Sequence, residues 1–175
     1  EADINAHSNA NGTTALIQSS HFGNYDVVRM LLDHGALSEK ANKKETTALM
    51  RASQEGHVNI VEALLSHNAN VNRRNHERMT SLMLASQRGH QDVVQVLIGA
   101  GASQVLNERT SQNSTALMLA CKRGHQRVVN CLLSAGAELY LRDSRGRTAR
   151  DIAIRKGFKT IAKELSPCLQ NHLIR

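Results

Sequence analysis

The sequence predicts an all-α solenoid of five stacked helix-turn-helix units connected by hairpin-like loops. One string, Thr-x-Leu-Met-x-Ala-x-x-x-Gly-His, occurs in full at residues 47–57, 80–90 and 115–125. Weaker copies begin at Thr14 and Thr148. A second string, close to Val-Val-x-x-Leu-Leu, starts at Val27, Ile60, Val93 and Val128. The copies recur every 33 to 35 residues, and self-similarity at this period is typical of proteins whose repeats pack on their neighbours.

Each unit carries signals for two short helices. Threonine is a favoured N-cap, because its hydroxyl accepts a hydrogen bond from a free backbone N–H of the first turn. The glycine near the end of the first string suits the left-handed conformation that closes a helix. The second string places its apolar residues on one face of a second helix. We expect that helix to stop at Gly35 in the first unit and at Asn68 in the second, since asparagine tolerates the same geometry.

These signals predict the boundaries of the units. We expect repeats at residues 9–40, 41–73, 74–108, 109–141 and 142–175, preceded at residues 1–8 by the tail of an upstream repeat or a linker. The fifth repeat has the charged surface that a C-terminal cap needs. The segment 103–114 is two residues longer than the other loops, and it is either a specificity loop or a tolerated insertion. Because the chain lacks an initiator methionine, we expect it to be part of a larger multidomain protein.

The composition argues against membrane-spanning and metal-knuckle proteins. No apolar run approaches the roughly 18 residues of a transmembrane helix, and the 2% aromatic content suits a thin aliphatic core. The three cysteines are too far apart for a metal knuckle. Cys121 and Cys131 replace small or apolar residues of the other repeats. We therefore expect packed, reduced thiols and an intracellular protein, in the cytoplasm or the nucleus.

The order of these motifs resembles the ankyrin repeat family over nearly the whole chain. The matching elements are Thr-x-Leu-x-x-Ala, Gly-His, Val-Val-x-x-Leu-Leu and Gly-Ala, repeated in register. The family's usual Thr-Pro-Leu-His start is altered, because alanine or serine stands at the proline position. The histidine position holds Ile17, Met50, Met83, Met118 and Asp151. We expect the three methionines to form a seam in the core.

No set of residues indicates catalysis. His57, His90 and His125 recur once per repeat, but stacked helices lie about 8–10 Å apart, whereas two nitrogens on one zinc ion are at most about 4 Å apart. We therefore expect these histidines to be structural. There is no Gly-rich phosphate loop and no local catalytic motif. We expect no enzyme activity, no cofactor and no metal.

The resemblance also implies where a partner binds, because partners of this family dock on the loop tips and on the exposed side of the first helices. The basic and histidine residues at these positions are Lys43, Lys44, Arg73, Arg74, His76, Arg78, Arg88, Arg109, Lys122, Arg123, Arg142, Arg145 and Arg155. Residues 1–70 contain 5 basic and 8 acidic side chains, whereas residues 71–175 contain 17 and 7. We expect the strip to become steadily more basic toward the C-terminus and to attract an acidic partner.

Two functions compete at this point. The first is a protein-interaction scaffold whose basic concave strip binds an acidic or extended segment of a partner protein. The alternative is a polyanion, either nucleic acid or an anionic membrane surface. Nucleic acid is disfavoured because few aromatic side chains are available to stack on bases, although contacts to duplex phosphates need none. Phe22 and Tyr25 either anchor a partner or pack against an upstream repeat. A further alternative is that the basic residues serve only solubility.

Overall fold

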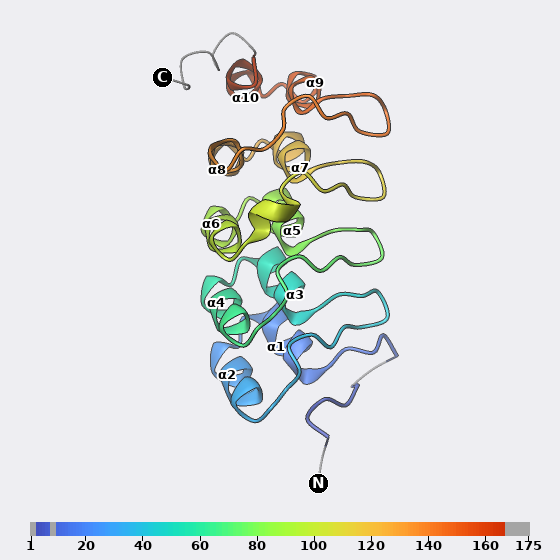
Figure 1. Ribbon diagram of the computed structural model, residues 1–175, viewed down its shortest axis with the longest axis vertical. Helices are drawn as coiled ribbons and strands as arrows, with labels where there is room; N and C mark the ends of the chain where they lie inside the picture. Colours follow the sequence, from blue (N-terminus) through green and yellow to red (C-terminus); the bar gives the residue numbers. More distant parts are fainter. Residues whose placement is uncertain (1–2, 8–9, 167–175) are drawn as a thin grey trace.

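The computed structural model describes residues 3–7 and 10–166, which form a single row of stacked helix pairs (Figure 1). The pairs are α1 (Ala15–Phe22) with α2 (Tyr25–Asp33), α3 (Ala48–Glu55) with α4 (Val58–Ser66), α5 (Ser81–Arg88) with α6 (Gln91–Gly99), α7 (Ala116–Arg123) with α8 (Gln126–Ser134), and α9 (Ala149–Arg155) with α10 (Lys159–Glu164). We number these pairs as repeats 1 to 5. The described residues contain no strand, so the predicted all-α solenoid is confirmed.

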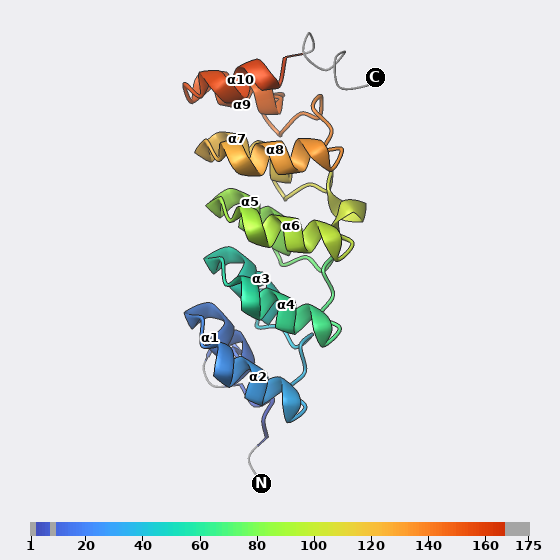
Figure 2. The same cartoon turned by 90° about the vertical axis from the view of Figure 1, so that its left-hand side faces the viewer.

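The first helix of each pair is an inner helix and the second is an outer helix. Inner helices lie between the outer helices and a row of projecting loops (Figure 1). Outer helices follow one another along the opposite side of the stack (Figure 2). Most contacts between elements are within a pair or between successive inner or successive outer helices. The structure therefore has one thin core that runs the length of the stack.

Every inner helix begins at a threonine, as the sequence predicts. In each case the hydroxyl accepts a hydrogen bond from the backbone N–H three residues later, at 3.2–3.3 Å. The five caps are Thr14, Thr47, Thr80, Thr115 and Thr148. At Thr148 the carboxylate of Asp151 also accepts a hydrogen bond from the backbone N–H of Thr148, which completes a capping box.

A histidine and a glycine join successive repeats at the turn between their two helices. The His125 ring packs so closely on Gly89 that a Cβ there would lie 2.5 Å from its Nδ1 atom. The Nε2 atom of His125 is 3.1 Å from the carbonyl oxygen of Gln87. His90 and His57 make the same contact one and two repeats earlier. These histidines thus have the structural role expected of them.

The core contains the predicted methionine seam. Met50 and Met83 are completely buried and Met118 is 2% exposed. The Cys121 thiol is also buried, and burial raises its pKa to about 12. Both observations confirm the expected packing roles.

The loops before the inner helices form fingers with a common tip. We name them finger 2 to finger 5, after the repeat that follows; their tips span residues 42–46, 75–79, 110–114 and 143–147. The first residue of each tip accepts hydrogen bonds from the backbone N–H groups two and four residues later. These first residues are Asn42, Asn75, Thr110 and Asp143. One backbone bond also connects each tip with the preceding one, for example from Ser144 N to Gln112 O at 3.1 Å.

The two extra residues of segment 103–114 do not lengthen the tip of finger 4. They are taken up near its base, where the 3-10 helix η1 (Ala102–Val105) follows α6. Leu106 is buried behind this turn and Val105 is half-buried. The insertion thus leaves the spacing of the tips unchanged.

The N-terminal end of the stack leaves apolar surface uncovered. Val27 of α2 is 43% exposed. Its equivalents in the next three repeats are at most 1% exposed; they are Ile60, Val93 and Val128. Phe22, Tyr25 and Met30 are exposed on the same repeat. Val27 of repeat 1 is therefore exposed at a position that the next three repeats bury.

The histidine–glycine contact predicts a difference between two glycines. Both Gly89 and Gly136 have positive φ, at 86° and 91°, but a Cβ at Gly136 would meet nothing within 4 Å. We expect Gly136→Ala to lower the free energy of unfolding by about 1 kcal/mol, from backbone strain alone. Gly89→Ala adds a steric clash with His125, for a total of about 2–4 kcal/mol. Urea denaturation followed by circular dichroism measures both, and equal losses would show that the ring contact contributes nothing.

Candidate partner-binding groove

The concave side of the stack lies between the inner helices and the fingers, and its charge changes along the row. The two residues before the closing glycine of each inner helix show this change. They are Gln54 and Glu55 in repeat 2, Gln87 and Arg88 in repeat 3, Lys122 and Arg123 in repeat 4, and Arg155 and Lys156 in repeat 5. All five basic residues are exposed. The charge of these positions thus rises from repeat 2 to repeat 5.

The fingers do not show the same steady increase. The tip of finger 4 carries only Ser111, Gln112 and Asn113 between its two ends, and none of them is charged. Lys43, Lys44, His76, Arg78 and Arg145 lie within tips and are exposed. The neutral tip of finger 4, the third of the four, interrupts the steady rise in positive charge that we expect along the strip.

Four of the arginines expected at tips lie instead in the loop segments directly before the tips. They are Arg73, Arg74, Arg109 and Arg142. Arg73 is paired with both Glu39 and Glu45, at 3.5 and 2.8 Å. Arg74 pairs with Glu108 at 2.9 Å. Since their charges are already compensated by neighbouring repeats, Arg73 and Arg74 are poorly suited to bind a partner.

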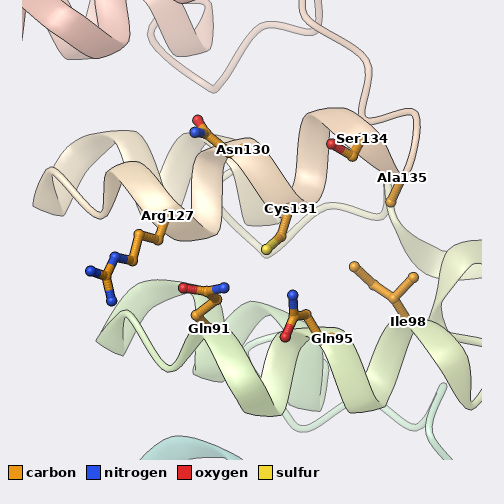
Figure 3. Close-up of a pocket in the computed structure, with 8 residues that line it drawn as sticks. All are labelled: Gln91, Gln95, Ile98, Arg127, Asn130, Cys131, Ser134 and Ala135. Atoms are coloured by element: carbon orange, nitrogen blue, oxygen red, sulfur yellow. The ribbon is translucent and has the colours of Figure 1, made fainter.

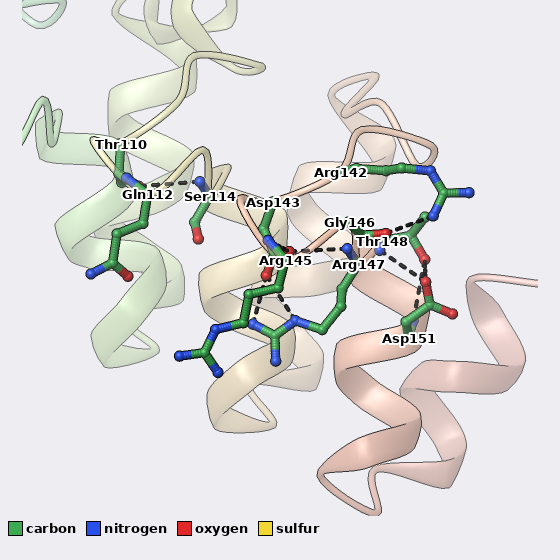
Figure 4. A network of polar contacts seen from close by, with 10 residues as sticks. All are labelled: Thr110, Gln112, Ser114, Arg142, Asp143, Arg145, Gly146, Arg147, Thr148 and Asp151. Carbon is green, nitrogen blue, oxygen red and sulfur yellow. Dashed lines mark hydrogen bonds and ion pairs between the residues drawn. The ribbon is translucent and has the colours of Figure 1, made fainter.

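Arg109 and Arg142 are also less available than a tip residue. Arg109 is half-buried beside η1, in a hollow of about 370 Å³ that it shares with Arg78 and Glu108. Arg142 is exposed, but its Nη1 atom donates to the carbonyl oxygen of Gly146 at 2.6 Å. This bond holds the Arg142 side chain against its own finger (Figure 4).

A partly enclosed cavity of about 270 Å³ lies between the last two inner helices and the last two fingers. We call it the C-terminal groove. Its basic lining residues are Lys122, Arg145, Arg147, Arg155 and Lys156. The other lining residues are Gln112, Ser114, Met118, Leu119, Asp143, Ser144 and Ile152. The C-terminal groove thus combines five cations with a single carboxylate and a floor of three apolar side chains.

That carboxylate, Asp143, is buried and fully used inside the protein. Its Oδ1 atom accepts from the backbone N–H groups of Arg145 and Arg147, at 2.9 and 3.0 Å. Its Oδ2 atom accepts from Nε and Nη2 of Arg147, at 2.9 and 2.6 Å. Burial alone opposes ionisation of Asp143, but the hydrogen bonds and charge of Arg147 outweigh it, so the pKa of Asp143 is lowered. Figure 4 shows this network within finger 5.

The remaining four cations of the C-terminal groove are unpaired. Within the described part of the chain, no carboxylate forms an ion pair with Lys122, Arg145, Arg155 or Lys156. All four are exposed. Positive charge is therefore concentrated where repeat 4 meets repeat 5.

Comparison with protein families identifies the repeat. A family model described as ankyrin repeats in three copies matches residues 1–75, 37–108 and 82–172. The chain belongs to the ankyrin repeat family. Ankyrin repeats generally mediate protein–protein interaction, and proteins of this family are typically scaffolds without enzymatic activity. No curated protein matches the chain.

The described residues of this ankyrin repeat protein include neither a membrane-spanning helix nor a cluster of metal ligands. Among residues 3–7 and 10–166, no helix has the length and apolar character needed to cross a bilayer. No cluster of three metal-ligating side chains occurs in that same part. Parts of the predicted N-terminal tail, of the first repeat and of the fifth repeat fall on residues 1–2, 8–9 and 167–175, outside the described residues.

A second cavity, of about 650 Å³, lies on the opposite side of the stack between α6 and α8 (Figure 3). Gln91 and Gln95 of α6 face Arg127 and Cys131 of α8 across it. Cys131 is half-buried and packs against the core, in agreement with the expected packing role. Because it lies on the outer helix α8, it also borders this cavity. Burial raises the pKa of the Cys131 thiol, so at neutral pH it is protonated.

Asp143 is absent from the predicted site residues, although the spacing of the repeats indicates that it closes the tip of finger 5. Asp143 stands 33 residues after Thr110, which stands 35 residues after Asn75, and Asn75 stands 33 after Asn42. Aligning the repeats therefore identifies it as the residue that closes a tip. The pairing of Arg147 with the second carboxylate oxygen has no equivalent in the other repeats and could not be predicted from their alignment. Lys156 and Arg147 join the predicted residues Lys122, Arg145 and Arg155 in the groove.

Replacing Asp143 tests this network. We expect Asp143→Asn to lower the free energy of unfolding by about 1–3 kcal/mol at pH 7, since it leaves Arg147 without a charged partner. Because folding lowers the pKa of Asp143, its carboxylate stabilises the fold above the unfolded pKa of about 3.9. The difference from wild type should therefore shrink as the pH falls below about 4.

Denaturation at several pH values measures this difference. The control is Asp92→Asn at an exposed position of α6, where we expect a change within about 0.5 kcal/mol. A loss at Asp143 that stayed constant down to pH 3 would show that its charge is not what stabilises finger 5.

Proposed function

We propose that this ankyrin repeat protein is a non-catalytic interaction module, and that its concave face on repeats 3 to 5 binds an acidic, extended segment of a partner protein. The observation that carries the proposal is the C-terminal groove, in which four cations have no ion-pair partner among the described residues while Asp143 is buried and bonded to Arg147. Unpaired cations on a preformed surface attract and orient an acidic ligand at little reorganisation cost.

The shape of the surface supports an extended ligand. The tips of fingers 2 to 5 are connected by backbone hydrogen bonds, and the inner helices pack in register beside them. The inner helices and finger tips therefore present their side chains at regular intervals along one face. An extended peptide can follow this face from repeat 3 to repeat 5, where Arg88, Lys122, Arg123, Arg155 and Lys156 succeed one another.

A polyanion is the alternative that the same charges allow. The residues that line the C-terminal groove include no aromatic side chain, so stacking of unpaired bases has no support there. Contacts to duplex phosphates or to anionic lipid need only the cations. The test must therefore separate a protein partner from nucleic acid.

Matched charge reversals provide that test. The groove variant is Lys122→Glu/Arg123→Glu/Arg155→Glu. The control variant is Arg127→Glu/Lys159→Glu/Lys163→Glu, which changes the net charge equally on the exposed surface of the outer helices. Both are used, with wild type, to capture proteins from a cell lysate before and after nuclease treatment, with quantification by mass spectrometry.

We expect nuclease-resistant partners with acidic segments to fall about tenfold in the groove variant and to persist in the control. Loss of the same proteins after nuclease treatment of wild type would favour nucleic acid instead. Equal capture by wild type and groove variant would contradict the proposal.

A further inference from the structure

Within the C-terminal groove, we propose a pocket for a phosphorylated side chain of the partner, phosphoserine or phosphothreonine. This inference rests on the proposed function and names one group that the acidic segment carries. A carboxylate offers one negative charge and two oxygens. A phosphate monoester carries about −1.5 to −2 charge at pH 7 and three strong acceptor oxygens. Four cations line one cavity without an ion-pair partner in the part of the chain that the structure describes, and they match a phosphate monoester better than a carboxylate.

The four cations come from different elements and surround the cavity. Lys122 lies on α7, Arg145 on the tip of finger 5, and Arg155 on the last turn of α9, with Lys156 directly after it. The two arginines supply planar donor groups that suit phosphate oxygens. The two lysines add ammonium groups, whose positive charge has no planar geometry and sits on a flexible side chain.

Finger 5 is held in place before any ligand binds. Asp143 fixes the backbone N–H of Arg145 and the side chain of Arg147. Figure 4 shows Arg145 and Arg147 leaving the finger toward the same side, with Arg142 directed elsewhere. Although Asp143 lines the cavity, both of its oxygens accept hydrogen bonds within finger 5 and its charge is compensated by Arg147, which reduces its repulsion of an incoming anion.

The cavity is also suitable in size and lining. Its volume is about 270 Å³, enough for a phosphorylated side chain and not for a large cofactor. Met118, Leu119 and Ile152 form an apolar floor that suits the carbon atoms of such a side chain. Gln112, Ser114 and Ser144 add neutral polar groups.

The same constellation does not occur in the preceding repeats. The residues equivalent to Arg145 are Lys44, Glu77 and Gln112. The residues equivalent to Arg155 are Gln54, Gln87 and Lys122. At these positions, only between repeats 4 and 5 does a basic finger-tip residue, Arg145, coincide with basic residues on the two neighbouring inner helices, Lys122 and Arg155. This contrast makes the site a local pocket within the broader basic strip.

The test uses three fluorescein-labelled peptide pools that differ at one position. Each pool has degenerate flanking residues around a central phosphoserine, glutamate or serine. Binding to the whole chain is measured by fluorescence anisotropy at fixed ionic strength. We expect the phosphoserine pool to bind about tenfold more tightly than the glutamate pool, the gain from about one additional charge-assisted hydrogen bond.

Two variants locate the effect. Arg145→Gln/Arg155→Gln should reduce the preference for phosphoserine over glutamate to about twofold or less. Arg88→Gln/Arg123→Gln removes two cations of the strip outside the pocket, and it should weaken both pools while the preference remains. Circular dichroism melting checks that each variant folds.

The outcomes separate the pocket from the proposed function. Binding of the glutamate pool with no preference for phosphoserine would overturn the pocket alone. A preference that survives Arg145→Gln/Arg155→Gln would place the phosphate elsewhere and overturn it as well. Absence of binding by every pool would contradict the acidic-peptide function itself. Tighter binding of a labelled DNA duplex than of any pool would assign the cations to nucleic acid instead.

Discussion

The structure depends on the contact in which a histidine ring of one repeat packs on the glycine of the preceding repeat. This contact requires a glycine with positive φ, a flat ring, and a carbonyl oxygen within reach of Nε2. It fixes the turn of each helix pair against the turn before it. At the C-terminal end Phe158 takes the histidine position and packs on Gly124. Repeat 5 therefore joins the stack by packing without the ring hydrogen bond.

Stacking in register has a direct consequence for the concave face. Residues at one position of the repeat are brought into a row, so a charge that changes from repeat to repeat becomes a gradient along a surface. Glu55, Arg88, Arg123 and Lys156 form one such row. The fingers form a second row, held together by the backbone bonds between their tips. The strongest positive charge arises where both rows are basic, between repeats 4 and 5.

Much of the fold follows from the sequence, and less of the site does. The threonine caps, closing glycines, methionine seam and structural histidines depend on local chemistry that recurs in every copy, so the pattern reveals them. The pairing of Arg73 with Glu39 and Glu45 depends on residues about 30 positions away in a neighbouring repeat. The placement of the two extra residues in η1 and the position of Cys131 beside a cavity likewise depend on packing between repeats. Such features require the three-dimensional arrangement.

Photo-crosslinking tests most directly whether the concave face of repeats 3 to 5 is the binding surface. A benzophenone amino acid is introduced either at Ser144, on the tip of finger 5, or at Gln95, on the outer helix α6; both positions are exposed. With the acidic partner recovered by capture, we expect a crosslinked product from Ser144 and none from Gln95. Crosslinking from Gln95 alone would place the partner on the outer face and contradict the account.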